Sequence, residues 1–202
     1  MIERILKKFE EIQRQYARDY CDFERGEFDL GYFYNERTNV SLLAGAVWRE
    51  NPTDNLVLEE YSSDKEGEDA SDYKGRRDLW FRAGGTQYRC EAKQKWVDLE
   101  TVTKADIDAI IDLAKSEAET IEERYLRPRN EALGIVFATL RLKRKNQQKA
   151  NEWLENFNRL IDDSCCEGLI IHSVIIDEVL TAGGDSNLHP GVVVFIWSRS
   201  AR

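Results

Sequence analysis

Two carboxylic acids and an amine near the middle of the chain, Asp78, Glu91 and Lys93, have a spacing that could bring them together. They lie on two strand-like segments joined by Gly84 and Gly85, a pair typical of a two-residue hairpin turn. Counting outward from that turn places Asp78 opposite Glu91, with Cβ atoms about 5 Å apart. Because side chains alternate between the faces of a strand, Lys93 shares a face with Glu91. The sequence therefore predicts two adjacent carboxylates with an ammonium group beside them.

Such a pair of carboxylates is typical of sites for hard divalent cations. Two carboxylates at this distance repel each other, which raises one pKa unless a cation lies nearby. Mg²⁺ binds one or two carboxylates and leaves positions for water and phosphate oxygens. A neighbouring lysine can orient a water or offset the charge that develops on a phosphate. The pattern favours Mg²⁺-dependent phosphodiester hydrolysis, with Mn²⁺ as a substitute, and it needs no histidine in a chain that has only two.

The same residues also fit an interpretation without chemistry, in which acids and a lysine form a cluster on a solvated sheet face. The tripeptide acid-x-Lys is weakly specific, because Asp72-Tyr73-Lys74 matches it too. An apolar reverse face, which includes Phe81 and Tyr88, and the helix expected after the hairpin favour the hydrolytic interpretation. The residues alone leave both interpretations open.

Apolar spacing along the chain predicts helices and strands in an order typical of mixed α/β proteins. Thr38 or Asn39 is expected to cap the second helix and Thr103 the third, which ends before Pro128. The segment 62–74 is charged and polar and is expected to be an exposed loop. The expected helices are 2–20, 40–48, 104–125 and 146–161, and the expected strands are 56–61, 77–83, 86–93, 133–140, 168–179 and 191–198.

The composition is that of one globular domain. With 202 residues, of which 42% are hydrophobic, the chain can bury one sizeable core, and 1–202 are expected to form a single α/β domain. No apolar run reaches the roughly 18 residues of a membrane span. Charges run through 1–9, where a signal peptide would be apolar, and four cysteines without a Cys-x-x-Cys pair are expected to be reduced thiols. We therefore expect a cytoplasmic protein that does not enter a membrane.

The segments around the two acids resemble the PD-(D/E)XK nuclease superfamily, which has the restriction-endonuclease-like fold. The expected order of helix, three strands, helix and strand over about 36–140 is similar to the common core of that family. The resemblance implies that 1–35, with an extra N-terminal helix, and 141–202, with a helix and two strands, are elaborations. The matching segments are Gly75-Arg76-Arg77-Asp78-Leu79-Trp80-Phe81 and Tyr88-Arg89-Cys90-Glu91-Ala92-Lys93-Gln94.

The resemblance implies a Mg²⁺-dependent deoxyribonuclease whose catalytic residues are Asp78, Glu91 and Lys93. In that family the two acids bind the metal and the lysine assists the attacking water. A glutamate from the preceding helix often completes the metal site. Glu36, near the start of that helix, is the first choice for this third ligand, and Glu50, at its far end, is the second.

Several further residues are candidates for the same cleft. Glu59 or Glu60, on the strand after the helix, could also reach inward as the third acid. In the family, a polar residue directly after the lysine often lines the cleft, and basic residues near the hairpin are candidates for further contacts. The candidate substrate-binding residues are Gln94, Lys95, Arg77, which replaces the family's usual proline, and Arg82.

The charge of the chain is unevenly distributed. A formal net charge of −9 opposes general binding to nucleic acid. However, 74–95 contain seven basic and two acidic residues, and 141–149 contain five basic residues and no acidic ones. Local patches of this kind can hold DNA at a defined cleft, while a homodimer or a protein partner stays open. The alternative function is a non-catalytic member of the same fold that binds nucleic acid or a protein.

Overall fold

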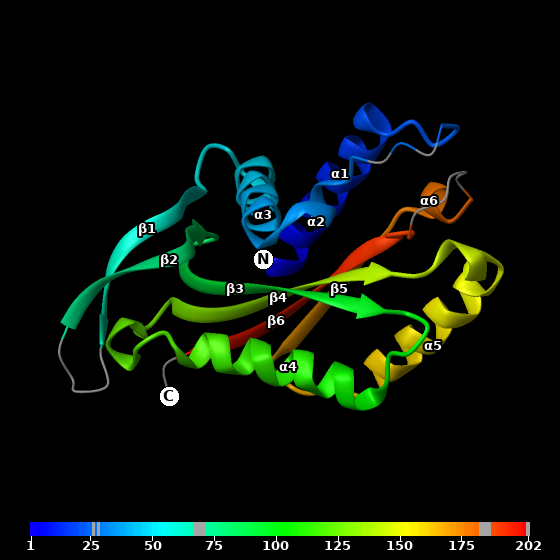
Figure 1. Ribbon diagram of the computed structural model, residues 1–202. Coiled ribbons are helices and arrows are strands. Elements are labelled where there is room, and N and C mark those ends of the chain that lie inside the picture. Colours follow the sequence, from blue (N-terminus) through cyan, green and yellow to red (C-terminus); the bar gives the residue numbers. More distant parts are fainter. Residues whose placement is uncertain (26, 28, 67–71, 182–186, 201–202) are drawn as a thin grey trace.

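The computed structural model describes residues 1–25, 27, 29–66, 72–181 and 187–200. Within these residues, six strands form one mixed sheet with the order β1-β2-β3-β4-β6-β5 (Figure 1). The protein is therefore of the mixed α/β class, as expected. The strands are β1 (Leu56–Glu66), β2 (Asp72–Ala83), β3 (Thr86–Asp98), β4 (Asn130–Arg141), β5 (Leu169–Ile175) and β6 (Gly191–Ser200).

Helices cover both faces of the sheet. In Figure 1, α1, α2 and α3 lie on one face, and α4 and α5 lie on the other. None of the helices in the described residues is long and apolar enough to cross a membrane. The helices are α1 (Ile2–Tyr20), α2 (Gly31–Tyr34), α3 (Glu36–Glu50), α4 (Lys104–Glu119), α5 (Ala150–Asp162) and α6 (Asp177–Thr181), with 3₁₀ turns η1 (Glu123–Tyr125) and η2 (Arg144–Lys149).

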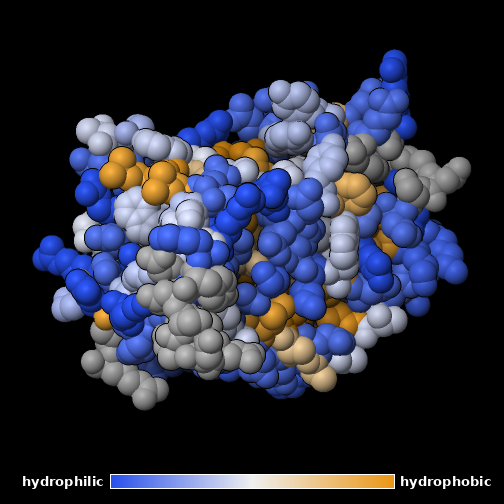
Figure 2. All heavy atoms as spheres, turned by 60° about the vertical axis from the view of Figure 1, so that its left-hand side comes forward, coloured by the Kyte–Doolittle hydropathy of each residue, from blue (hydrophilic) through white to orange (hydrophobic). Residues whose placement is uncertain are grey.

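The central part of the chain has the element order expected from the sequence, α3-β1-β2-β3-α4-β4. The first three strands form an antiparallel meander, and β3 pairs with β4 in parallel through α4. The C-terminal strands β6 and β5 extend the sheet beyond β4 as antiparallel neighbours. Figure 2 shows that the end of the molecule with the β1–β2 hairpin is largely hydrophilic.

The β2–β3 hairpin has the expected register, but its ladder contains fewer residue pairs than expected. Gly84 and Gly85 have φ values of 58° and 80°, which favour glycine. The β2–β3 ladder runs from the pair next to this turn as far as Leu79 and Cys90. Beyond that pair, β2 continues beside β1 while β3 continues beside β4. Asp78 and Glu91 are therefore not a ladder pair, and we call this point of divergence the β2–β3 fork.

A close contact between α4 and β4 brings α4 near the fork. Gly134 of β4 is the ladder partner of Glu91 on β3. A Cβ atom at Gly134 would lie 1.8 Å from the carbonyl oxygen of Ala114 in α4. The missing side chain thus allows the helix backbone to rest directly on the sheet. The consequence is that the C-terminal turns of α4 lie beside β3.

Four expectations about the elements were wrong. Most of 62–74 is strand, because β1 and β2 pair through this segment, and 67–71 lie outside the described residues. Asn35 caps α3 by accepting a hydrogen bond from the Thr38 amide, so the helix begins before Thr38 and Asn39. Helix α4 ends before Tyr125, which lies in η1. The last expected part of strand 168–179 is the short helix α6.

Candidate active site at the β2–β3 fork

Lys93 lies between carboxylates that come from opposite faces of the sheet. Its Nζ atom is 4.0 Å from Oε2 of Glu36, in the first turn of α3, and 3.7 Å from Oε2 of Glu117, on α4. The same ammonium group donates a hydrogen bond of 2.8 Å to the carbonyl of Ala92. The structure therefore surrounds the predicted lysine with acids and leaves its side chain 42% exposed.

Asp78 closes the fork between the diverging strands. Its Oδ2 atom accepts a hydrogen bond of 2.7 Å from the Ala92 amide, which links β2 to β3 beyond the end of their ladder. Its negative charge also contributes to raising the pKa values of Glu36 and Glu91. Asp78 is thus the common electrostatic neighbour of both predicted metal-binding glutamates.

The pKa of Glu36 is raised above its ordinary value. Burial is the largest cause, and the charges of Asp78 and Glu117 raise the pKa further. The ammonium group of Lys93 and a hydrogen bond from the backbone amide of Gln94 lower this pKa. A carboxyl that is partly buried among other carboxylates would gain from a nearby cation. Of the acids considered for the third position, Glu36 is the one whose carboxyl lies beside the Lys93 ammonium group.

Glu91 is engaged more tightly than the sequence suggested. Its Oε1 atom accepts hydrogen bonds of 2.8 Å from Nζ of Lys65 and of 2.8 Å from Nη1 of Arg77. The pKa of Glu91 is nevertheless raised, chiefly because the side chain is buried, with a further contribution from Asp78. Both of these contacts use Oε1, so among the described residues Oε2 is the oxygen that can accept a new partner.

Arg77 is a structural residue and not a substrate contact. Its side chain is 0% exposed, and its guanidinium group pairs with Glu91 and also with Glu122. A buried arginine of this kind needs carboxylate partners because an unpaired charge is costly inside a protein. The expectation that Arg77 binds substrate is therefore wrong.

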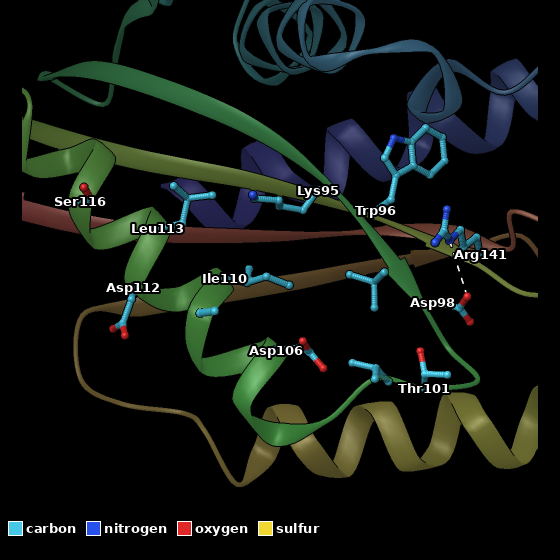
Figure 3. Close-up of a pocket in the computed structure, with 13 residues that line it drawn as sticks. Lys95, Trp96, Asp98, Thr101, Asp106, Ile110, Asp112, Leu113, Ser116 and Arg141 are labelled. Atoms are coloured by element: carbon cyan, nitrogen blue, oxygen red, sulfur yellow. Dashed lines mark ion pairs between the residues drawn. The ribbon is translucent and has the colours of Figure 1, made fainter.

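The other predicted residues lie in several places. Gln94 donates hydrogen bonds to the Tyr32 carbonyl and to Oγ1 of Thr139, so its amide ties α2 to the sheet. Arg82 is exposed near the hairpin turn, at the opposite end of β2 from the β1–β2 hairpin. Lys95 and Trp96 both belong to the lining of a cavity of about 630 Å³ between β3 and α4, and in Figure 3 the Trp96 ring points to the side of β3 away from α4.

The alternative third acids have other partners. Glu50, at the end of α3, pairs with Arg4 and accepts a hydrogen bond from Asn55. Glu59 accepts a hydrogen bond from Ser41, and Glu60 pairs with Arg37 and Arg76. Both glutamates also line a smaller cavity of about 220 Å³ together with Glu36 and Asp78. This second cavity borders the fork and gives the acids an opening to solvent.

The donor set has oxygen atoms only, as a hard divalent cation requires, but they are not assembled into a coordination group. Among the described residues, no three histidine, cysteine or acidic side chains are close enough to hold a metal ion. Asp78, Glu36 and Glu91 are close enough for their charges to raise pKa values, and this repulsion is what a cation would relieve. The chemistry of these side chains fits Mg²⁺ or Mn²⁺.

Sequence reasoning missed three residues of this site. Glu117 borders the buried stripe of α4, so its position beside that stripe was the available signal. Lys65 was hidden in a charged segment that we expected to be a loop, and Glu122 follows the end of α4.

Comparisons of the chain with models of protein families, with curated proteins and with solved structures give no match.

Proposed function

We propose that the protein is a divalent-metal-dependent nuclease that hydrolyses phosphodiester bonds in DNA at the β2–β3 fork. The observation that carries the proposal is the position of Lys93 between Glu36 and Glu117, next to the strand amide that Asp78 binds. An ammonium group held between two acids suits a reaction in which negative charge develops on a phosphate. The expected resemblance to the PD-(D/E)XK superfamily supports the same proposal.

The residues that would hold the metal are Asp78, Glu91 through its Oε2 atom, and Glu36. When bound, a divalent cation supplies neutralising charge and lowers the pKa of a water ligand. Lys65 and Arg77 hold Oε1 of Glu91, which orients the carboxylate toward the fork. The fixed orientation reduces the side-chain entropy that ligand binding would cost.

Lys93 would orient the attacking water and stabilise the negative charge of the pentacoordinate transition state. Its reach is limited by the hydrogen bond to the Ala92 carbonyl and by the ion pair with Glu117. Glu117 is only 15% exposed, so it can hold the ammonium group without competing for the metal from solvent. Glu117 therefore acts as a positioning residue for Lys93.

A cleavage assay with matched variants tests the proposal. With Mg²⁺ or Mn²⁺, the wild-type protein should cut DNA, and Asp78→Asn, Glu91→Gln and Lys93→Met should each lower the rate at least about a hundredfold. Lys104→Met is the control, because Lys104 is exposed on α4 and its contacts in the described part of the chain are with Asp108 of the same helix and with Ser164. Equal cleavage by the wild type and all variants would reveal a contaminating nuclease and refute the proposal.

A second candidate function is a non-catalytic module that binds nucleic acid. It is favoured by the pairing of Glu91 with Lys65 and Arg77, because an acid with a purely structural role would also be neutralised by basic side chains. Calorimetric titration with Mn²⁺ separates the two functions. Binding that is lost in Asp78→Asn supports the nuclease, and absence of binding together with retained DNA affinity supports the module.

A further inference from the structure

An exposed group of aromatic rings lies along β3 beyond Lys93. The ring centre of Phe33 lies 5.7 Å from that of Trp96 and 4.7 Å from that of His189, and the Trp96 and His189 centres are 5.2 Å apart. Tyr34 lies against Phe33, with ring centres 6.1 Å apart. We call these four side chains the aromatic cluster. Because Phe33 is 41%, Tyr34 51% and Trp96 44% exposed, the cluster belongs to the surface and not to the core.

The aromatic cluster and the candidate active site are built from the same two segments. Phe33 precedes Glu36 by three residues, and Trp96 follows Lys93 by three. At one end of these segments Nζ of Lys93 lies 4.0 Å from Oε2 of Glu36, and at the other end the Phe33 and Trp96 rings meet. Three residues of a strand span about 10 Å, so a polymer bound at Lys93 can also reach the cluster.

Hydrogen bonds behind the rings fix the aromatic cluster in place. The Gln94 side chain donates a hydrogen bond of 3.2 Å to the Tyr32 carbonyl, and the hydroxyl of the buried Tyr32 donates one of 2.8 Å to the His189 carbonyl. Burial and the charge of Arg141 lower the pKa of His189, so its ring is uncharged at neutral pH. Rings held in this way lose little conformational freedom when a ligand binds.

The strand that joins Lys93 to the cluster is open along one side. The ladder between β2 and β3 ends at Leu79 and Cys90, and from there to Asp98 the partner of β3 within the described residues is β4 alone. In Figure 3 the Trp96 ring points to the side of β3 away from α4. Lys93 and Trp96 therefore lie along a stretch of β3 that β2 has left uncovered.

We propose that the aromatic cluster stacks on an unpaired base of a single-stranded DNA substrate, an inference that rests on the proposed function. Aromatic side chains bind bases of any sequence by stacking, whereas bases inside a duplex are covered by their neighbours. A protein partner would need about 20–30 residues on each side, but one indole can cover one base. At about 3.4 Å per stacked nucleotide, the bound base is about three nucleotides from the phosphate at Lys93.

The first experiment uses the wild-type protein in EDTA, which prevents metal-dependent cleavage, and a single strand of thymidines. Among the five tryptophan indole N–H signals in an NMR spectrum, that of Trp96 should shift when the strand is added. The Trp48 signal is the internal control, because Trp48 is 42% exposed near the opposite end of α3 from Glu36. The Trp96→Phe and Trp48→Phe variants assign the two signals. A blunt duplex of the same length should leave the Trp96 signal unchanged.

The second experiment measures the affinity for a fluorescent single strand by anisotropy. Trp96→Ala should weaken binding about tenfold, because stacking on one base is lost, and Phe33→Ala should weaken it in the same direction. Trp96→Phe should keep most of the affinity, and Trp48→Ala should keep all of it. Circular dichroism shows whether each variant is folded, and the exposed position of Trp96 makes a loss of folding unexpected.

The inference is overturned if the single strand leaves the Trp96 signal unchanged, if the duplex shifts it equally, or if Trp96→Ala and Trp48→Ala bind alike. A Trp96 signal that depends on protein concentration without DNA would assign the cluster to a contact between two copies of the chain and overturn it as well. Cleavage of DNA with an unmoved Trp96 signal would refute this inference alone. Stacking on Trp96 without any cleavage would refute only the nuclease proposal.

Discussion

Replacing Arg77 by methionine tests whether the buried ion pairs hold the fork together. Arg77→Met keeps most of the apolar volume but removes the guanidinium group that pairs with Glu91 and Glu122, whose side chains are 8% and 10% exposed. Removing one partner of a buried pair typically costs about 3–5 kcal/mol. Lys65 still pairs with Glu91, so we expect about 3 kcal/mol, the lower end of that range.

The expected loss depends on pH in a direction set by Glu91. The pKa of Glu91 is raised in the folded protein, so protonation favours folding, and stability falls as pH rises from the unfolded to the folded pKa. Arg77→Met should raise this pKa further. The variant should therefore lose most at pH 8 and recover part of its stability near pH 5.

Urea unfolding at both pH values measures these effects. At pH 8 the melting temperature should also fall by about 10 °C for a domain of this size. Arg76→Met is the matched control, because the neighbouring Arg76 is 74% exposed and its pair with Glu60 is worth about 1 kcal/mol or less. A loss below about 1 kcal/mol for Arg77→Met, or an equal loss at the two pH values, would refute this reasoning.

Three further predictions concern packing and electrostatics. Gly134→Ala should lower the free energy of unfolding by several kcal/mol in chemical denaturation, because the new Cβ meets the α4 backbone. Gly45→Ala should instead raise it by about 0.5–1 kcal/mol, because Gly45 lies within α3 and its new Cβ would make an ordinary contact. Asp78→Asn should lower the pKa values of both Glu36 and Glu91 in a carboxyl NMR titration, because it removes a charge that raises them. Lys93→Met should instead raise the pKa of Glu36 in the same titration.

The hairpin and the element order were predictable because they depend on local signals. Gly84 and Gly85 define the turn, and alternation from there gives the pairing as far as Leu79 and Cys90. The end of that ladder was not predictable, because it depends on the long-range pairing of β2 with β1 and of β3 with β4, which draws the two strands apart. The prediction that Asp78 pairs directly with Glu91 was wrong for this reason.

The partners of Glu91 could not be read from the sequence. Arg77 is buried only because acids 14 and 45 positions away meet its guanidinium group. A basic residue next to an acid in a strand otherwise predicts a solvated side chain. Glu36 was the first choice for the third acid because the family resemblance implies a glutamate near the start of the preceding helix, and it does lie beside Lys93.

A manganese-soaked crystal tests the central claim most directly. Anomalous scattering should locate one Mn²⁺ ion at the β2–β3 fork, with carboxylate oxygens of Asp78 and Glu91 among its ligands. A fully soaked crystal without a peak at the fork, or with Mn²⁺ bound only by residues elsewhere, would contradict the claim that these acids form a catalytic metal site.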